Sequence, residues 1–199
     1  MFAFIALPVA LAAGSFAMPA ALSARQDPCT ALGAGAASTL SYNFQLEVVD
    51  PSAAEGATGT VLALVNGDST TGNWWLKEIH QNSTGDFSSW TLNGGALIPT
   101  PSSSNADTVG SDMAVNAGDA LEFAVTTKGA ANAAAGQTPY CAVSNADGHA
   151  TLTVNSVSDE FFVCQASTSE YVLAFSPSAS SSVYDYSTCT KQLVHLVPA

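Results

Sequence analysis

The sequence predicts an all-β protein with a single domain of about twelve short strands. Three observations support this fold class. Apolar residues alternate with polar ones over short runs, as they do in strands with one buried face. Turn sequences such as Asn93-Gly94 and Asp147-Gly148 separate many of these runs. Beyond the N-terminal region, no stretch has the 3.6-residue periodicity of an amphipathic helix.

The first part of the chain has the character of a signal peptide. Residues 1–17 carry no charged side chain and contain short apolar runs. Small residues and then a polar stretch follow, and the apolar part is too short for a membrane span. We therefore expect residues 1–24 to be removed on secretion and the mature protein to have no membrane segment. Residues 25–39, which are rich in Gly and Ala, are predicted to be a flexible linker.

The predicted all-β domain occupies residues 40–199. Its first strand alternates strictly, because Tyr42, Phe44, Leu46 and Val48 are apolar and the residues between them are polar. The other predicted strands are residues 59–65, 74–79, 87–92, 96–99, 112–115, 120–126, 140–143, 150–154, 161–164, 170–175 and 192–197. Polar or small-residue stretches, which are residues 101–107 and 129–136, are predicted to be loops.

A weak rhythm of about fifty residues suggests how these strands are arranged. Residues 87–97 resemble residues 140–152, since each consists of a strand, an Asn/Gly turn and a strand. The closing strand at residues 192–197 follows after about the same interval again. Three units of four strands would form a β-trefoil-like domain. The alternative is a two-sheet antiparallel β-sandwich whose strands recur at similar spacing, and the sequence leaves both arrangements open.

Four cysteines follow the leader, and they are Cys29, Cys141, Cys164 and Cys189. An even number of cysteines in an exported chain predicts two disulfides. Of the three pairings, we expect Cys164 with Cys189, because both lie in or beside neighbouring C-terminal strands. That pairing leaves Cys29 with Cys141. The wide spacing and the lack of a Cys-x-x-Cys pair argue against zinc, and no metal or cofactor is predicted.

The charge balance argues against two classes of partner. The chain has four Lys plus Arg residues and sixteen Asp plus Glu residues, which gives a net charge of −12. With so few cations it cannot neutralise phosphates, so neither nucleic acid nor an anionic membrane is expected to bind. If the protein has a macromolecular partner, the one we expect is a cell-wall polysaccharide.

The sequence contains no recognisable catalytic constellation. The three histidines are isolated in the sequence, and they are His80, His149 and His195. Asp159 and Glu160 are neighbours, so in a strand their side chains point to opposite faces. Spaced carboxylates such as Asp112, Asp119 and Glu122 have the character of an acidic surface. We therefore predict that the protein is not an enzyme, with a glycoside hydrolase as an alternative, since that chemistry needs only two carboxyl groups.

Two aromatic pairs are candidates for stacking against sugars. Trp74 and Trp75 are neighbours in a predicted strand, so if one fills the core the other is exposed or needs a cover. Tyr184 and Tyr186, expected to share one face, form the second pair. An exposed aromatic ring is a natural platform for a sugar, and the alternative is that loops cover these rings. Asn82 starts the chain's one Asn-x-Ser/Thr sequence and is the predicted glycosylation site.

Several features of the chain together resemble a known family. They are Cys29, a Phe-x-Leu strand at Phe44 and Leu46, a hairpin with Gly148 and Leu152, then Phe162-Val163-Cys164, Tyr171 and Cys189. In this pattern the chain is similar to the PhiA-like cell wall proteins, small secreted fungal proteins that include IgE-binding allergens. The resemblance implies a secreted, non-enzymatic structural or surface protein associated with the cell wall. The alternative function that we keep open is a carbohydrate-binding module for chitin or β-glucan.

Overall fold

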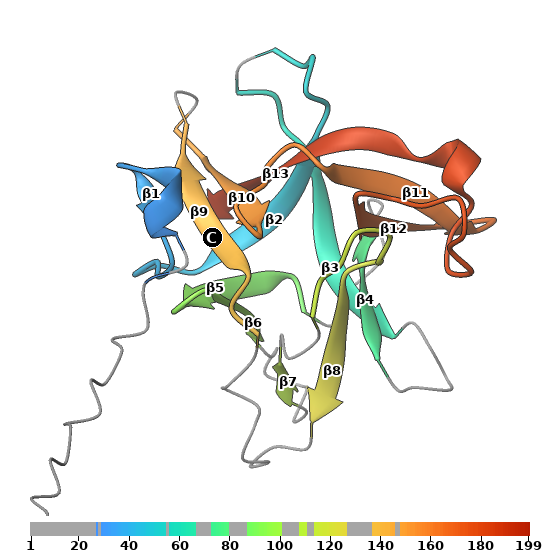
Figure 1. Cartoon of the computed structure of the whole chain (residues 1–199), viewed down its shortest axis with the longest axis horizontal. Coiled ribbons are helices and arrows are strands. Elements are labelled where there is room, and N and C mark those ends of the chain that lie inside the picture. Colours follow the sequence, from blue (N-terminus) through green and yellow to red (C-terminus); the bar gives the residue numbers. More distant parts are fainter. Residues whose placement is uncertain are drawn as a thin grey trace, which may run out of the picture.

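Figure 1 shows the computed structural model of the chain, which describes residues 27, 29–54, 56–66, 73–79, 87–100, 108–110, 114–126, 137–145 and 148–199. The protein is all-β in this part, with thirteen strands and two short 3-10 helices. The predicted signal peptide, the predicted glycosylation site Asn82 and the predicted loops at 101–107 and 129–136 lie outside the described residues.

Six strands form a closed antiparallel barrel. They are β2 (Phe44–Val49), β3 (Thr60–Asn66), β4 (Trp74–Glu78), β11 (Phe161–Ser167), β12 (Glu170–Phe175) and β13 (Thr190–Pro198). Around the barrel their order is β2, β3, β4, β12, β11 and β13, and the pairing of β13 with β2 closes the ring. This closing seam extends from Leu193 opposite Val49 to Pro198 opposite Phe44.

Alternate side chains of the barrel strands point inward and form the main hydrophobic core. On β2 the buried residues Phe44, Leu46 and Val48 alternate with the partly buried Gln45 and Glu47, so the predicted alternation is confirmed for this strand. The other barrel strands contribute Leu62, Leu64, Leu76, Phe161, Val163, Leu173, Phe175, Val194 and Leu196. Burial of these side chains is the main source of the barrel's stability.

Three hairpins extend from one end of the barrel. They are β5 (Ser89–Asn93) with β6 (Ala96–Thr100), β7 (Thr108–Gly110) with β8 (Glu122–Thr126), and β9 (Tyr140–Ser144) with β10 (Ala150–Val154). β5 pairs with the start of β2, β8 with the start of β4, and β10 with the end of β13. These positions lie at the same end because β2 and β4 run parallel and β13 runs opposite to them. Trp90, Phe123 and Tyr140 from the hairpins join the core at that end.

The order of the strands differs from the one expected from the fifty-residue rhythm. A trefoil repeats a four-strand unit three times, with a hairpin inside each unit. Here the three hairpins follow one another between β4 and β11, so the trefoil-like arrangement is not confirmed. Residues 87–97 and 140–152 resemble each other because both contain a hairpin. The alternative of two separate sheets is not found either, since the barrel strands close on themselves.

The prediction of a flexible linker at residues 25–39 is wrong for residues 29–39. This stretch forms helix η1 (Thr30–Leu32) and strand β1 (Ala36–Ala37), which pairs with β9. Cys29 is joined to Cys141 of β9 by a disulfide, as expected from the sequence. The Gly and Ala residues do not make a linker here, because a disulfide and backbone hydrogen bonds fix them to an edge strand.

Smaller differences between the predicted and the observed strands concern single elements. Ala114 and Val115, predicted to end a strand, are in no strand, and residues 111–113 lie outside the described part. Strand β7 was not predicted. The turn between β5 and β6 is confirmed, with φ values of 57° at Gly94 and 84° at Gly95. These backbone angles favour glycine, which has no Cβ to clash.

Candidate functional site

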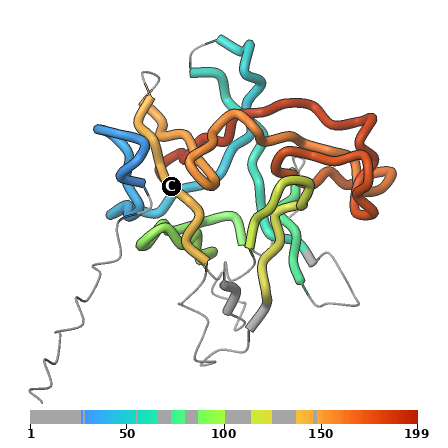
Figure 2. The backbone as a smooth tube through the Cα atoms, in the orientation of Figure 1, coloured from blue at the N-terminus to red at the C-terminus, as the bar shows by residue number. Residues whose placement is uncertain are grey.

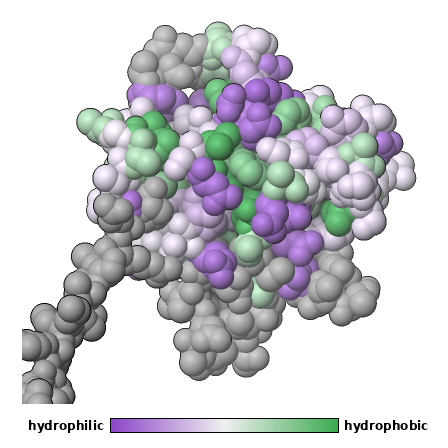
Figure 3. Space-filling model, viewed as in Figure 1, coloured by the Kyte–Doolittle hydropathy of each residue, from purple (hydrophilic) through white to green (hydrophobic). Residues whose placement is uncertain are grey.

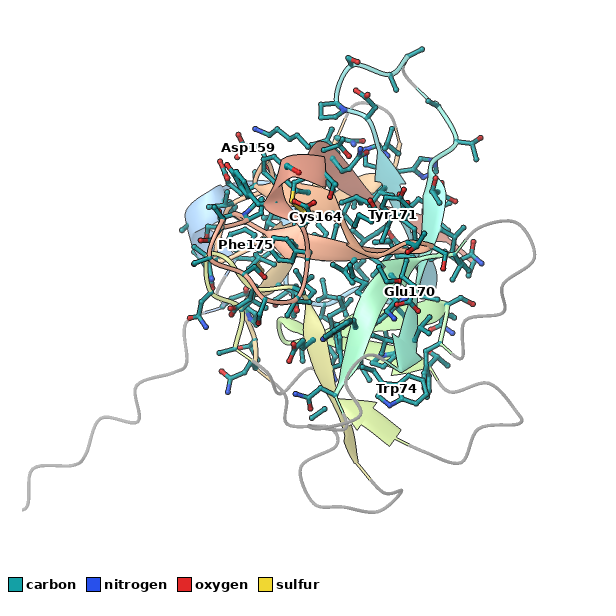
Figure 4. All side chains as sticks on the ribbon, turned by 90° about the vertical axis from the view of Figure 1, so that its right-hand side faces the viewer. Trp74, Asp159, Cys164, Glu170, Tyr171 and Phe175 are labelled. Carbon is teal, nitrogen blue, oxygen red and sulfur yellow. A yellow bond between two sulfur atoms is a disulfide. The ribbon has the colours of Figure 1, made fainter. Side chains whose placement is uncertain are left out.

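Residues 176–189, here called the C-terminal segment, fold over the outside of the barrel. Underneath lie the outward-facing Cys164, Val172 and Ala174, which form a second buried cluster with Tyr184 of the segment and Ala120. Figure 4 shows Cys164 on this face, between Phe175 and Tyr171 of β12. The segment therefore covers apolar surface that the barrel leaves outside.

The C-terminal segment is fixed to strand β11 at its far end. Cys164 forms the predicted disulfide with Cys189, and their Cα atoms are 4.1 Å apart. The pairing follows from the register, since Val163 of β11 lies opposite Thr190 of β13. The amide of Gln165 also donates to the hydroxyl oxygen of Thr188, at 2.9 Å.

Asp185 begins helix η2 (Tyr186–Thr188) and fixes its first turn. Its Oδ1 accepts hydrogen bonds from the hydroxyl of Ser187 at 2.8 Å and from the amide of Ser187 at 2.9 Å. These bonds, the hydroxyl first and then the amide, lower the pKa of Asp185 from its ordinary value of 3.8. The ionised carboxylate therefore stabilises the turn that carries Tyr186.

Tyr184 and Tyr186 do not share a face, contrary to the prediction. The strand geometry behind that prediction is absent, because η2 begins at Tyr186. Tyr184 is buried, and its hydroxyl donates to the carbonyl of Gly118 at 2.7 Å and accepts from the amide of Ser178 at 3.0 Å. Tyr184 is thus a structural residue that no sugar can stack on, whereas the side chain of Tyr186 is 50% exposed.

Trp74 and Trp75 point to opposite faces of β4, as their adjacent positions predict. Trp74 packs against the main core, with its ring 5.6 Å from that of Phe87 in an edge-on arrangement. Trp75 packs against the second buried cluster, which lies beneath the C-terminal segment, and the ammonium group of Lys77 lies 5.4 Å from the centre of the Trp75 ring. Both tryptophans are partly buried and in contact with neighbours, so neither presents a free ring for stacking.

The exposed ring of Tyr186 borders a groove, here called the tyrosine groove. Its volume is about 420 Å³, and it is lined by Glu160, Phe162, Ser176, Pro177, Tyr186, Ser187 and Cys189. Glu160 accepts a hydrogen bond from the hydroxyl of Ser176 at 3.2 Å. The groove therefore combines two aromatic rings with hydroxyl groups and one carboxylate.

A second recess, here called the serine cleft, lies between the C-terminal segment and the stretch from Ala114 to Glu122. Its volume is about 610 Å³, and it is lined by Ala114, Asn116, Ala117, Gly118, Asp119, Ala120, Glu122, Ser178, Ser180, Ser181, Ser182 and Val183. Tyr184 ties its two walls together, because its hydroxyl bonds to Gly118 on one wall and to Ser178 on the other.

Both carboxylates of the serine cleft are fixed by neighbouring groups. Glu122 accepts from the indole N–H of Trp75 at 2.9 Å and from the side-chain amide of Asn73 at 3.2 Å. Asp119 accepts from the amide of Asn116 at 2.9 Å. Asp119 and Glu122, assigned to dispersed surface in the sequence analysis, are thus brought into one recess, while Asp112 lies outside the described residues.

Metal and membrane features can be assessed for the described part of the chain. In those residues, no group of three or more His, Cys, Asp or Glu side chains is placed to hold a metal ion. Over the same ranges, no helix has the length and apolar character needed to cross a membrane. Figure 3 shows hydrophobic residues scattered among hydrophilic ones on the face in view.

Comparison with known proteins adds no assignment. No family model matches the chain, and neither a curated protein nor a solved structure matches it. The resemblance to the PhiA-like cell wall proteins therefore stays a prediction.

Sequence analysis missed most of the residues that line the two recesses. The serines at 176–182 were assigned to no binding site, and Phe162 was named only as a strand residue and in the family resemblance. One signal could have placed Tyr186 correctly, since Asp185 before it is a residue type that is preferred at a helix N-cap. The recesses themselves depend on contacts between distant segments, which no local pattern encodes.

Proposed function

We propose that the protein is a secreted, non-enzymatic protein of the fungal cell-wall type that binds wall polysaccharide in the tyrosine groove. This proposal joins two predictions from the sequence, the wall-associated protein and the carbohydrate-binding module. The observation that carries it is the half-exposed ring of Tyr186 beside a groove with polar side chains.

The chemistry of the tyrosine groove matches that of a sugar ring. One face of a pyranose carries C–H groups that pack on an aromatic ring, and its rim carries hydroxyls that need donors and acceptors. Tyr186 and Phe162 offer the aromatic contact, and Glu160, Ser176 and Ser187 offer hydrogen-bonding groups. Because the disulfide and the Asp185 turn fix this surface, little conformational entropy is lost on binding.

Two disulfides are consistent with a protein that works outside the cell, where thiols are oxidised. The net charge of −12 supports a partner that is not a polyanion.

The alternative of a glycoside hydrolase has one observation in its favour, which is that Asp119 and Glu122 line the same cleft. Both carboxylates also have structural partners, which account for their positions without catalysis. Glu122 fixes Trp75 and Asn73, and Asp119 closes the turn that begins at Asn116. We therefore favour binding without hydrolysis.

Sedimentation with insoluble chitin and insoluble β-1,3-glucan tests the proposal. We expect the protein to bind at least one of them and Tyr186→Ala to weaken binding at least about tenfold, since stacking aromatics dominate such sites. Tyr42→Ala is the matched control, because Tyr42 is 39% exposed and does not line the groove. Absence of binding to both polymers, or equal loss in the two variants, would contradict the proposal. Release of reducing sugar would favour the hydrolase instead.

A further inference from the structure

We infer that the serine cleft is a second glycan subsite, which accepts neutral and amine-bearing sugar units and rejects uronic acids. The inference rests on the proposed function, because it adds a subsite for the same polysaccharide in a second recess lined by the C-terminal segment.

The walls of the serine cleft are fixed before any ligand arrives. Besides the two hydrogen bonds of Tyr184, the amide of Gly118 donates to the carbonyl of Phe175 at 2.9 Å. The amide of Leu121 donates to the carbonyl of Leu173 at 2.8 Å, which fixes the same wall to β12. Gly118 itself has a φ of 95°, and a Cβ there would lie 3.2 Å from the Cβ of Ser178 on the facing wall. A cleft fixed in this way is preorganised for binding.

The lining of the cleft suits a polyhydroxylated ligand. Four serines and Asn116 supply groups that both donate and accept hydrogen bonds, as sugar hydroxyls require. Small apolar side chains, those of the exposed Ala114 and Ala117 among them, offer surface for the C–H groups of a sugar ring. A volume of about 610 Å³ lies in the range of typical small-ligand sites.

The charge of the lining sets the selectivity. Asp119 and Glu122 are in the lining, and none of the lining residues is Lys, Arg or His. A uronate would bring a third carboxylate into this recess without a cation to balance it, which costs binding energy. A protonated amine would gain from the same two carboxylates. The tyrosine groove also contains a carboxylate, that of Glu160, so both subsites favour the same class of polymer.

The C-terminal segment lines both recesses. A long glycan chain can therefore occupy both subsites, whereas a single sugar unit occupies one. Ser176, Pro177, Tyr186 and Ser187 line the groove, and the intervening serines line the cleft. Two linked subsites bind more tightly than either does alone when one ligand reaches both. The subsite in the serine cleft should therefore contribute most to the affinity for long glycan chains.

Filling the cleft tests whether it binds glycan at all. Ser180→Trp places a large side chain in the lining, and Ala179→Trp is the matched control, because Ala179 is an exposed neighbour that does not line the cleft. With whichever of insoluble chitin and β-1,3-glucan the wild type binds, we expect Ser180→Trp to lose about tenfold or more in affinity, as for loss of one of two linked subsites. The control should stay within about twofold.

Neutralising the carboxylates tests the charge selectivity. The probes are hexamers of N-acetylglucosamine, glucosamine and galacturonic acid, and we expect the wild type to bind the last most weakly. Asp119→Asn with Glu122→Gln should lower the ratio of glucosamine to galacturonate affinity about tenfold. Asp50→Asn with Asp159→Asn changes the net charge equally, outside both recesses, and should lower the ratio less than about twofold.

The outcomes separate the two proposals. If the wild type binds no glycan, the proposed function fails and this inference fails with it. If binding depends on Tyr186 but Ser180→Trp matches its control, only the second subsite is overturned. If both charge-neutralised variants lower the affinity ratio equally, overall charge explains the preference and the assigned selectivity is overturned.

Discussion

The two disulfides fix two regions of very different character. The N-terminal anchor, residues 29–40, lies on one side of the molecule in Figure 2, and the C-terminal segment lies on the other. In the anchor only Cys29 and Ser38 are buried. Its attachment consists of the disulfide, backbone hydrogen bonds, a bond from the amide of Gly94 to the hydroxyl of Thr39, and the partly buried Leu40. The C-terminal segment instead covers an apolar cluster and buries Tyr184. In the first region the disulfide accompanies little burial, and in the second it accompanies an apolar cluster.

The largest expected effect comes from removing the disulfide of the anchor. Replacing Cys29 and Cys141 with Ala opens a loop with a sequence separation of 112 residues. In the chain-entropy model this lowers the free energy of unfolding by about 4 to 5 kcal/mol. Urea denaturation measures the loss, and hydrogen exchange should show the anchor's amides unprotected. If removing this disulfide lowers the free energy of unfolding less than removing the Cys164–Cys189 disulfide does, the comparison of the two regions is contradicted.

Removing the other disulfide should cost less and leave more structure in place. Replacing Cys164 and Cys189 with Ala opens a separation of 25 residues, for which the same model gives about 3 to 4 kcal/mol. Because Tyr184 stays buried, the amide of Ser178 should remain protected from hydrogen exchange. Full exchange of the C-terminal segment in this variant would mean that the disulfide, and not burial, holds it.

The smallest expected effect is on the pH dependence of stability, and it compares the two regions through one aspartate each. An exposed aspartate lies just before the anchor, Asp27, and another lies in the C-terminal segment, Asp185, and the pKa of each lies below the ordinary value of 3.8. For Asp27 the causes are the amide of Cys29 and then the hydroxyl of Ser38, and for Asp185 they are the hydroxyl and amide of Ser187. A lowered folded-state pKa stabilises the fold above pH 3.8, and this contribution is lost as the pH falls through the lowered value.

Titration by NMR in acid checks this expectation residue by residue. Both carboxylates should titrate below pH 3.8, and the Ser187 amide resonance should shift as Asp185 takes up its proton. In a Ser187→Ala variant the pKa of Asp185 should move back towards its ordinary value while that of Asp27 stays unchanged. A midpoint at or above 3.8 for either group in the wild type would contradict the assigned hydrogen bonds.

Local patterns were sufficient for most of the strands and for one disulfide. The alternation at Phe44 to Val48 predicted β2, and the closeness of Cys164 and Cys189 to neighbouring strands predicted their bond. The opposite orientation of Trp74 and Trp75 also followed from strand geometry alone. For β2 and the tryptophans the information lies within a few residues of the chain, and for the disulfide it lies within 25 residues.

Pairing between distant strands was not predictable in the same way. Nothing in the composition of β13 specifies β2 as its partner, because many strands of this chain carry a similar apolar face. The serine cleft has the same origin, since Tyr184 joins residues 118 and 178 only after the barrel exists. The anchor was mistaken for a linker because small residues are typical of both.

The position of the three hairpins between β4 and β11 has a consequence for the order of folding during synthesis. The barrel consists of two halves, β2 to β4 and β11 to β13, which pair within themselves in the orders β2–β3–β4 and β12–β11–β13. The hairpins pair locally and are complete early. Both seams between the halves, β12 with β4 and β13 with β2, require the last strands to be made. Until then the first half exposes the edge of β2 that pairs with β13 and the part of the β4 edge that β8 does not cover. These edges make a nascent chain prone to association, and closure of the barrel is a late, slow step.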